Sequence, residues 1–541
     1  LLLCSVPPAQ ANYLQRIGRA GRRDGNAFAM TVAEGSPHDL YFYADPMLMM
    51  AGDVEPPGIF LNAFAVISRQ LTAYSMDRWV QSGIQDSAIP KKMKPVLDGV
   101  GLGAVDQFPR NFTGFVNQQA LVLLEGFLHL FDGELSQTTC DRLRDFITGQ
   151  GDEDGLEMRL SKRLWELYEE RNNFQTKIKD LKNALTRLQK LPSDEATDIE
   201  IDAVEQERSS LQSMLSSLHG RQPLNYLTDE GLLPNYAFPE EGVTLRSVIY
   251  RKRAEGQSGE GKYINDVYEY ERPSAAAIRE LMPKSRFFAG ERKVEIEQVD
   301  LELSSIEKWR FCPSCTHSEQ ESSDALHSDC PKCGDEMWAD GGQLIEMVRL
   351  RQVMANTDDK NSRIGDDSDT RDPSFHVKQM LADFDSQSVK QAFRIQGDDV
   401  PFGFEFINKV AFREINFGEY GATGEEQSIA GIAEVRPGFK LCRQCGMVQD
   451  TKRFADGGQK HSYTCSARNS KDDNEDSLIE CLYLYREFGS EALRILLPSS
   501  DMDDGDCSIN SFIAGLQLGL KIKFGGKVDH LRVMSYSAPG T

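Results

Sequence analysis

Apolar residues recur at a helical spacing through most of the chain up to residue 220. The clearest pattern lies between 160 and 188, where apolar positions alternate in steps of four and three. Pro192 and Asp194 interrupt this pattern, and a second apolar seam runs from 201 to 218. Two long helices separated by such a break predict an antiparallel coiled-coil hairpin over residues 151–222. A hairpin of this kind is either a lever or partner-docking arm, or a structural insertion.

Shorter helical patterns precede the hairpin. Residues 60–80, 112–131 and 138–148 each have the spacing of a helix with one apolar face. Residues 59–150 are therefore expected to form a helical module. A winged helix and a plain helical bundle both fit this periodicity.

The start of the chain has a different order of elements. Apolar runs at 1–6 and 27–32 predict two buried strands, and the residues between them, 11–23, have a helical pattern. A strand–helix–strand order is typical of a parallel sheet. Residues 35–42 are rich in turn-forming residues and predict a loop.

Beyond residue 222 the pattern changes to strands and turns, which predicts a β-rich platform over residues 223–305. The segment that follows Cys481 has the pattern of a buried strand or helix, and residues 511–523 have that of an amphipathic helix. The whole chain is therefore expected to be a multidomain α+β protein.

The 541 residues suffice for roughly three or four domains. The composition, 40% apolar and 27% charged, is that of an ordinary globular protein. The sequence contains no apolar run of about 18 residues, so no membrane partner is expected. The formal net charge of −23 argues against non-specific coating of nucleic acid. The platform is nevertheless locally basic, and its candidate contacts with nucleic-acid phosphates are Arg272, Arg279, Lys284 and Arg286.

Seven of the eleven cysteines, together with one histidine, fall into two sets with metal-site spacing. The first set is two C-x2-C pairs separated by 14 residues, which is close to zinc-ribbon spacing and predicts a four-thiolate structural zinc site over residues 306–345. Its ligands are Cys312, Cys315, Cys330 and Cys333.

The second set begins with another C-x2-C pair and predicts a Cys3His zinc site within residues 346–541. Its expected ligands are Cys442, Cys445, His461 and Cys465. Cys481 is the rival fourth ligand, although a buried thiol among apolar neighbours also explains it. Clustered C-x2-C pairs without a visible secretory signal favour metal over disulfides and predict a reducing cytoplasm.

Residues 15–23 read QRIGRAGRR. On a helix, Arg19 and Arg22 would project from one face, and Gly18 and Gly21 would leave the surface between them bare. Planar guanidinium groups on a rigid element suit the growing charge of a phosphoryl group in transfer. Without the longer pattern, a basic helix start on a solvated face would explain the two arginines.

The pattern Q-x-x-G-R-x-G-R resembles motif VI of superfamily 2 helicases, the arginine-finger element of their second RecA-like motor domain. The resemblance implies that residues 1–58 are the end of that domain. Arg19 and Arg22 would then stabilise the γ-phosphate of ATP, and Gln15 would position nucleotide or water. The sequence contains no G-x-x-x-x-G-K-[ST] phosphate loop, so ATP, Mg²⁺ and that loop are expected to come with a separate N-terminal motor half.

Residues 223–305 resemble the region that follows the motor in helicases with an Mrr-associated zinc-binding domain, and residues 346–541 resemble that domain. Motif VI joined to such a domain is similar to RecQ-like helicases of the Hrq/MrfA type, and to large anti-phage helicases of the Druantia kind. The resemblance implies the C-terminal part of an ATP-dependent DNA helicase or translocase, in defence or DNA repair. It also implies DNA with a single-stranded segment, and other defence-system subunits, as partners. The alternative is a non-catalytic DNA-binding or scaffolding subunit. A nuclease is disfavoured, because the sequence has no PD-(D/E)xK-like run.

Overall fold

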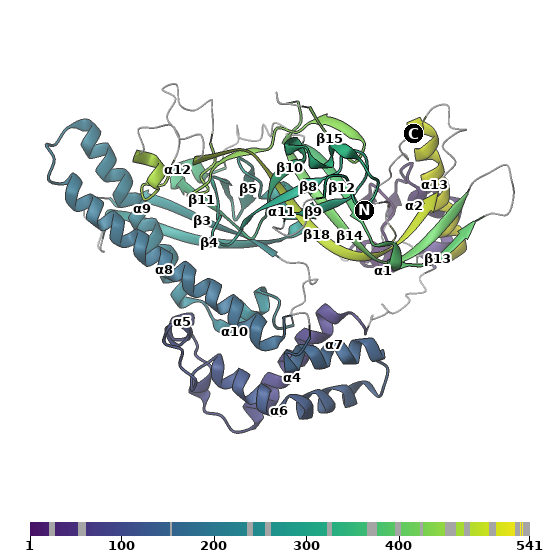
Figure 1. The fold of residues 1–541 in the computed structure, drawn as a ribbon, viewed down its shortest axis with the longest axis horizontal. Helices are drawn as coiled ribbons and strands as arrows, with labels where there is room; N and C mark the ends of the chain where they lie inside the picture. Colours follow the sequence, from purple (N-terminus) through teal and green to yellow (C-terminus); the bar gives the residue numbers. More distant parts are fainter. Residues whose placement is uncertain are drawn as a thin grey trace. The chain divides into compact units, whose positions relative to one another are not determined.

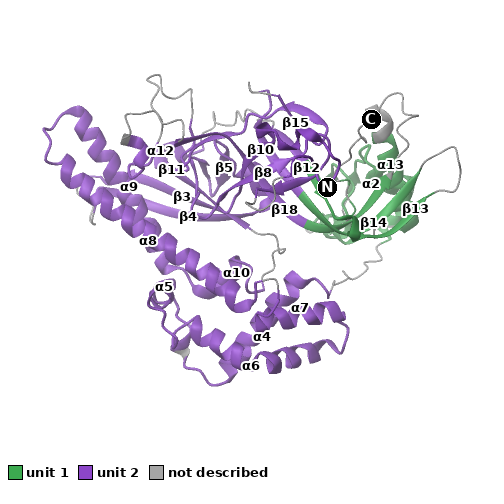
Figure 2. Cartoon of the chain, in the orientation of Figure 1, with its two compact units in different colours: residues 1–59, 380–412, 489–541 green, residues 60–379, 413–488 purple. Residues whose placement is uncertain are grey.

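The computed structural model describes two compact units, which Figure 2 distinguishes by colour. Unit 1 comprises residues 1–59, 380–412 and 489–541, and unit 2 comprises residues 60–379 and 413–488. The described residues are 1–20, 28–51, 61–151, 154–234, 242–254, 261–321, 327–364, 376–394, 402–421, 426–449, 461–469, 477–496, 505–524, 531 and 533.

Unit 1 begins with the predicted strand–helix–strand order. Strand β1 (Leu2–Leu3) pairs in parallel with β2 (Met30–Thr31), and helix α1 (Gln10–Ile17) lies between them in sequence. Leu3 and Tyr13 are buried in a small core with residues of the two following helices. The described elements do not by themselves test the RecA-like assignment, which stays a prediction.

Helix α1 is shorter than predicted. It ends at Ile17, and the N–H of Arg19 then donates to the carbonyl of Arg16 at 3.2 Å in a closing turn. Arg19 therefore lies after the helix and not on its face. Glycine is a poor helix former, and Gly18 is where the helix stops.

The prediction of a loop over residues 35–42 is wrong, because helix α2 (Pro37–Ala44) covers most of these residues. The Ser36 hydroxyl caps it by accepting from the Asp39 N–H at 3.1 Å, and Pro37 occupies the first helical position. Serine followed by proline favours a helix start as well as a turn, which explains the error. The short helix α3 (Met47–Met50) follows.

The later parts of unit 1 are strands and one long helix. Strand β13 (Val389–Arg394) pairs antiparallel with β14 (Gly403–Glu419), and helix α13 (Gly505–Phe524) contacts α2. Helix α13 includes the residues for which an amphipathic helix was predicted. The segment after Cys481 is a strand, β18 (Leu478–Leu496).

Unit 2 contains a helical part followed by sheets (Figure 1). Its first core is built from apolar side chains of four helices, among them the fully buried Leu71, Leu97, Phe112 and Leu143. The four helices are α4 (Phe64–Gln81), α5 (Met93–Leu102), α6 (Arg110–Leu128) and α7 (Gln137–Thr148). Short 3-10 turns lie at Asp86–Ala88 and His129–Phe131.

Two long helices follow and pack against each other, α8 (Leu156–Leu188) and α9 (Glu195–Gly220) (Figure 1). The Asp194 carboxylate caps α9 by accepting from the Thr197 N–H at 2.7 Å. In the second half of α8, Leu181, Leu185 and Leu188 pack against α9. The first half of α8 also packs into the core of α4 to α7, so this part of the seam belongs to more than two helices.

A four-stranded sheet lies beside this pair, with strand order β4-β3-β11-β7. Helix α9 contacts β4 and β3. The Arg246 side chain in β3 is only 3% exposed and pairs with Glu170 of α8 at 2.6 Å. The elements of this region are α10 (Pro223–Asp229), β3 (Gly242–Lys252), β4 (Tyr263–Pro273), α11 (Ser274–Glu280), β5 (Arg286–Ala289), β6 (Arg292–Glu295), β7 (Gln298–Val299), β11 (Gln352–Asp358) and α12 (Asp359–Ser362).

An eight-stranded sheet has the order β12-β14-β18-β10-β8-β9, with β13 on β14 and β17 on β18. Strand β18 runs parallel to β10, while β8 pairs antiparallel with β10. The strands of this sheet whose bounds are not yet given are β8 (Ile306–Phe311), β9 (Ser318–Gln320), β10 (Leu344–Arg349), β12 (His376–Asp383) and β17 (Phe439–Cys442). A separate hairpin joins β15 (Glu426–Ile429) to β16 (Ile432–Val435). The protein is thus a mixed α+β structure with a helical part, as expected.

None of the helices in the described ranges combines the length and the apolar character needed to cross a bilayer.

Candidate metal centres

The structure brings the first predicted ligand set together in unit 2. Cys312 and Cys315 follow strand β8, and Cys330 and Cys333 approach them from the next described loop. The Sγ atoms of Cys312 and Cys333 lie 3.4 Å apart, and those of Cys315 and Cys330 lie 3.7 Å apart. These separations exclude disulfides, whose sulfurs lie about 2 Å apart.

The separations fit a tetrahedral zinc ion. With Zn–S bonds of about 2.3 Å, the edge of the ligand tetrahedron is about 3.8 Å. All four donor atoms lie within 4.8 Å of one another. Four protein ligands leave no open position for water, so the cluster is suited to a structural ion and not to a catalytic one.

Backbone turns hold the thiols of the first cluster in place. The N–H of Cys315 points at the Cys312 sulfur at 3.4 Å, and the N–H of Gly334 donates to the Cys330 carbonyl at 2.8 Å. Gly334 has a φ of +78°, a conformation that disfavours residues with a Cβ. The buried Trp338 ring packs beside the cluster, against the buried Cys312 and Cys330, while Cys333 stays exposed.

The second predicted set also converges in unit 2, on the turn that follows β17. Cys442 and Cys465 have their Sγ atoms 3.8 Å apart. The Nδ1 atom of His461 lies 3.8 Å from the Cys445 sulfur and 3.7 Å from the Cys465 sulfur. A tetrahedron with one Zn–N bond of about 2.0 Å and Zn–S bonds of about 2.3 Å has mixed edges of about 3.5 Å. The two clusters are consistent with two zinc sites, as predicted.

The second cluster has the same turn geometry as the first. The N–H of Gly446 donates to the Cys442 carbonyl at 2.9 Å, and Gly446 has a φ of +67°. This turn packs directly on strand β7, where the Val299 N–H donates to the Gly446 carbonyl at 3.0 Å. The Gln298 side-chain amide also donates to the Cys445 carbonyl at 2.6 Å. The second cluster is therefore anchored to the four-stranded sheet.

The fourth ligand of the second cluster is His461 and not the rival Cys481. Cys481 is exposed on strand β18, between the buried residues Ile479 and Leu482. The sequence-based explanation of Cys481 as a buried thiol is therefore wrong. The pairing of β17 with β18 shifts register beside Cys481, so buried and exposed residues do not alternate regularly at this point of the strand.

The electrostatics of both clusters favour a cation. Burial raises the pKa of the Cys312 thiol to about 12 and holds that of Cys315 above its usual range. The hydrogen bond from Cys445 lowers the pKa of Cys442 to about 4. Closely packed thiols do not all ionise on their own, since each thiolate opposes the next. A bound divalent cation removes that penalty and holds the thiols as thiolates.

The residues of the helicase-like motif lie in unit 1. Gln15 is exposed on α1, and Gly18 and Arg19 are exposed just after it. Gly21 and Arg22 lie outside the described residues. The roles of these five residues in nucleotide chemistry stay predictions.

The predicted basic stretch is largely engaged within unit 2. Arg272 pairs with Glu280 at 3.1 Å and lies over the Phe287 ring at 4.8 Å. The Arg279 guanidinium donates to the Ala275 carbonyl at 3.4 Å. Lys284 occupies a left-handed turn, with φ of +66°, and Arg286 is exposed at the start of β5. Contact of these residues with nucleic acid stays a prediction.

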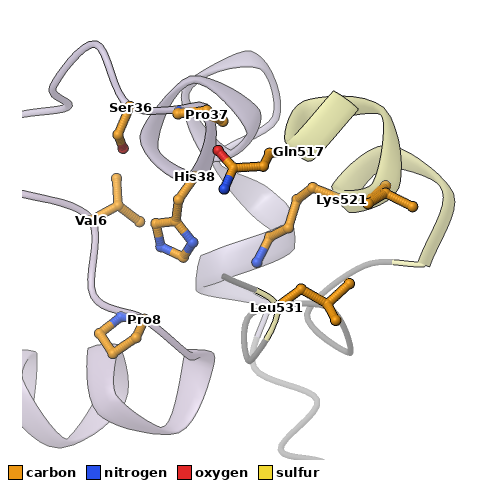
Figure 3. Close-up of a pocket in the computed structure, with 9 residues that line it drawn as sticks. Val6, Pro8, Ser36, Pro37, His38, Gln517, Lys521 and Leu531 are labelled. Atoms are coloured by element: carbon orange, nitrogen blue, oxygen red, sulfur yellow. The ribbon is translucent and has the colours of Figure 1, made fainter. Parts of the chain in front are cut away.

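A cavity of about 340 Å³ lies in unit 1, between the start of α2 and one face of α13. Figure 3 shows Lys521 of α13 and His38 of α2 pointing into it. The Lys521 side chain is buried, and its ammonium lies 5.2 Å from the centroid of the Phe42 ring. None of the nine described lining residues is a cysteine or a carboxylate, so this cavity differs chemically from the metal centres.

The sequence did not predict that a residue of α9, distant along the chain, supports the second cluster. Glu207 of α9 accepts hydrogen bonds from Ser462 and Tyr463, which lie between the ligands His461 and Cys465. No local sequence signal joins residues more than 250 positions apart.

The fold and the clusters define a mixed α+β protein with one four-cysteine and one Cys3His centre. No family model and no solved structure matches the chain. The chain is 22% identical over 483 residues to the Druantia protein DruE of Escherichia coli (strain UMEA 4076-1). The alignment covers 85% of the chain but 24% of DruE, so the chain spans about a quarter of the length of this relative. The similarity is distant.

Proposed function

We propose that the chain is the C-terminal part of an ATP-dependent DNA helicase or translocase that acts in anti-phage defence. The observation that carries the proposal is the motif Q-x-x-G-R-x-G-R at residues 15–22. The distant similarity to a Druantia protein, which extends over 85% of the chain, supports the defence role. The parallel pairing of β1 with β2 around α1 is compatible with the edge of a RecA-like sheet.

In this proposal Arg19 and Arg22 act on an ATP held by a separate motor half. Their guanidinium groups stabilise the charge that develops on the γ-phosphate, and Gln15 positions the nucleotide or the attacking water. Gly18 and Gly21 leave room for the phosphates to approach the backbone. Gln15 near the end of α1 and Arg19 just after it are both exposed, which leaves them accessible to such a partner.

The zinc-bearing sheets of unit 2 form the DNA-engaging module in this proposal. The two clusters make the loops around them rigid without contributing chemistry of their own. A rigid module of this kind suits a role in guiding a single strand away from the motor, with DNA and other defence-system subunits as its partners. The place of action is the cytoplasm.

The test is ATP hydrolysis by the longer protein with single arginine replacements. R19A and R22A should each lower DNA-stimulated ATP turnover by about 10³-fold or more, as loss of an arginine finger does, while DNA binding is retained. R144A is the matched control, because Arg144 is an exposed arginine that pairs with Asp141 on the surface of α7. Unchanged turnover in R19A and R22A would refute the arginine-finger role.

A second candidate function is a non-catalytic DNA-binding or scaffolding subunit that works with a separate motor chain. It is favoured by one observation, that the 541 residues contain no phosphate-loop sequence. In that case R19A and R22A would leave both ATP turnover and DNA binding intact. The same experiment therefore separates the two functions.

A further inference from the structure

The segment that carries two ligands of the second cluster is bound to helix α9. Its described part, residues 461–469, includes His461 and Cys465. The Glu207 carboxylate receives the Ser462 hydroxyl on one oxygen at 2.6 Å and the Tyr463 N–H on the other at 3.0 Å. One side chain of α9 thus holds both residues that follow the histidine ligand.

Two further contacts lie on either side of this carboxylate. The Tyr463 ring packs against the apolar residues that join α8 to α9, including Leu185 and Val204. The Arg468 guanidinium lies over the Tyr463 ring at 4.2 Å and 3.7 Å from the Glu200 carboxylate of α9. The ligand segment therefore has both a polar and an apolar attachment to the hairpin of α8 and α9.

We propose that Glu207 is a positioning residue of the Cys3His centre, and that it couples metal binding to the docking of this hairpin. A carboxylate that accepts two hydrogen bonds fixes the backbone of its partners more firmly than a neutral acceptor. With Ser462 and Tyr463 fixed, the His461 ring and the Cys465 sulfur are held near the geometry that zinc requires. The proposal depends on zinc binding by the second cluster and is independent of any motor activity.

The coupling is reciprocal. If Glu207 favours the metal-bound arrangement of residues 461–469, metal at the cluster must equally favour attachment of that segment to α9. Loss of the metal then loosens the attachment of residues 461–469 to α9, while the other side of the cluster stays anchored to the four-stranded sheet through Val299. The Cys3His centre thus adds a link between the hairpin and the sheet to the direct contacts that α9 makes with β3 and β4.

The first experiment measures the metal affinity of each cluster by competition with a chelator, in the full chain loaded with cobalt(II), whose absorption distinguishes four-thiolate from Cys3His coordination. E207A should weaken the second cluster by about ten- to a hundredfold, the usual effect of losing a group that orients metal ligands. The first cluster should not change. E169A is the matched control, because Glu169 is an exposed glutamate within α8.

Graded variants separate positioning from general damage to the fold. E207Q keeps an oxygen acceptor for the Tyr463 N–H and should lose less affinity than E207A. S462A removes one hydrogen bond and should also give an intermediate loss. If E207A, E207Q and S462A all bind metal at the second cluster as tightly as E169A, the positioning role is refuted. A loss at both clusters in these variants would refute it too, since it would indicate a general effect on folding.

The second experiment tests the reciprocal effect by hydrogen exchange. C445S removes a ligand of the second cluster only, and amides in the part of α9 around Glu200 and Glu207 should then exchange faster. Amides of α6, whose buried residues belong to the core of the helical part, serve as the internal control. Unchanged exchange in α9 after loss of the second metal ion would contradict the coupling.

Discussion

Each cluster has one glycine in the turn that follows a C-x2-C pair, here called a knuckle. These glycines provide a matched pair of substitutions, Gly334→Ala in the first cluster and Gly446→Ala in the second. Both glycines donate to the carbonyl of a cysteine four residues earlier, at 2.8 and 2.9 Å, and both have positive φ angles, +78° and +67°. An alanine at either position therefore has the same left-handed backbone strain, about 1–2 kcal/mol. The surroundings of the two glycines differ.

A Cβ at Gly334 would meet nothing within 4 Å, whereas a Cβ at Gly446 would lie 1.9 Å from the Val299 carbonyl oxygen. G446A must therefore push the knuckle and strand β7 apart by roughly 1 Å. That movement breaks the hydrogen bond from Val299 to Gly446, which contributes about 1 kcal/mol. The total cost of G446A should thus be about 3 kcal/mol or more.

The chelator-competition assay described for Glu207 measures this difference at each cluster. Strain in the metal-bound knuckle lowers metal affinity, because the knuckle relaxes when the metal leaves. G334A should weaken the first cluster by about tenfold, and G446A should weaken the second by more than about a hundredfold, at 1.4 kcal/mol per factor of ten. Equal losses in the two variants would refute the inferred close approach of Gly446 to β7.

Two further predictions concern the metal content and the response to pH. Elemental analysis of the purified chain should find two zinc ions per molecule, one in each cluster, and a value near one would show that one cluster does not bind zinc. Burial raises the pKa of the Asp300 carboxyl from its usual value of 3.8 to about 6. The protonated carboxyl therefore adds to the free energy of unfolding below pH 3.8, and this contribution is lost as the pH rises through about 6. Urea unfolding should therefore show D300N gaining about 3 kcal/mol relative to the native chain between about pH 4 and pH 7, and a pH-independent difference would contradict the raised pKa.

The metal ligands were predictable from sequence because each C-x2-C knuckle is a local feature. The turn that brings Cys312 near Cys315 depends only on the residues between them, and two such turns suffice to outline a tetrahedron. The choice of His461 over Cys481 depended on how the segment around Cys481 folds, and the sequence did not decide there between a strand and a helix. Spacing alone thus predicted the cluster, and the fold decided its last ligand.

Features that depend on long-range packing were not predictable. Arg246 lies in a strand with a mostly buried face, and its partner Glu170 comes from a helix 76 residues earlier. A buried pair of this kind is stable only with the right geometry on both elements, which no local pattern reveals. The same holds for Glu207, whose partners lie 255 and 256 residues away.

The central claim, that this chain completes an ATP-hydrolysing motor, is tested most directly by mixing it with an N-terminal fragment of the longer protein that carries the phosphate loop. DNA-stimulated ATP hydrolysis by the mixture should exceed the sum of the two separate activities, and R22A in this chain should abolish the gain. A stable complex of the two fragments with no gain in hydrolysis would contradict the claim.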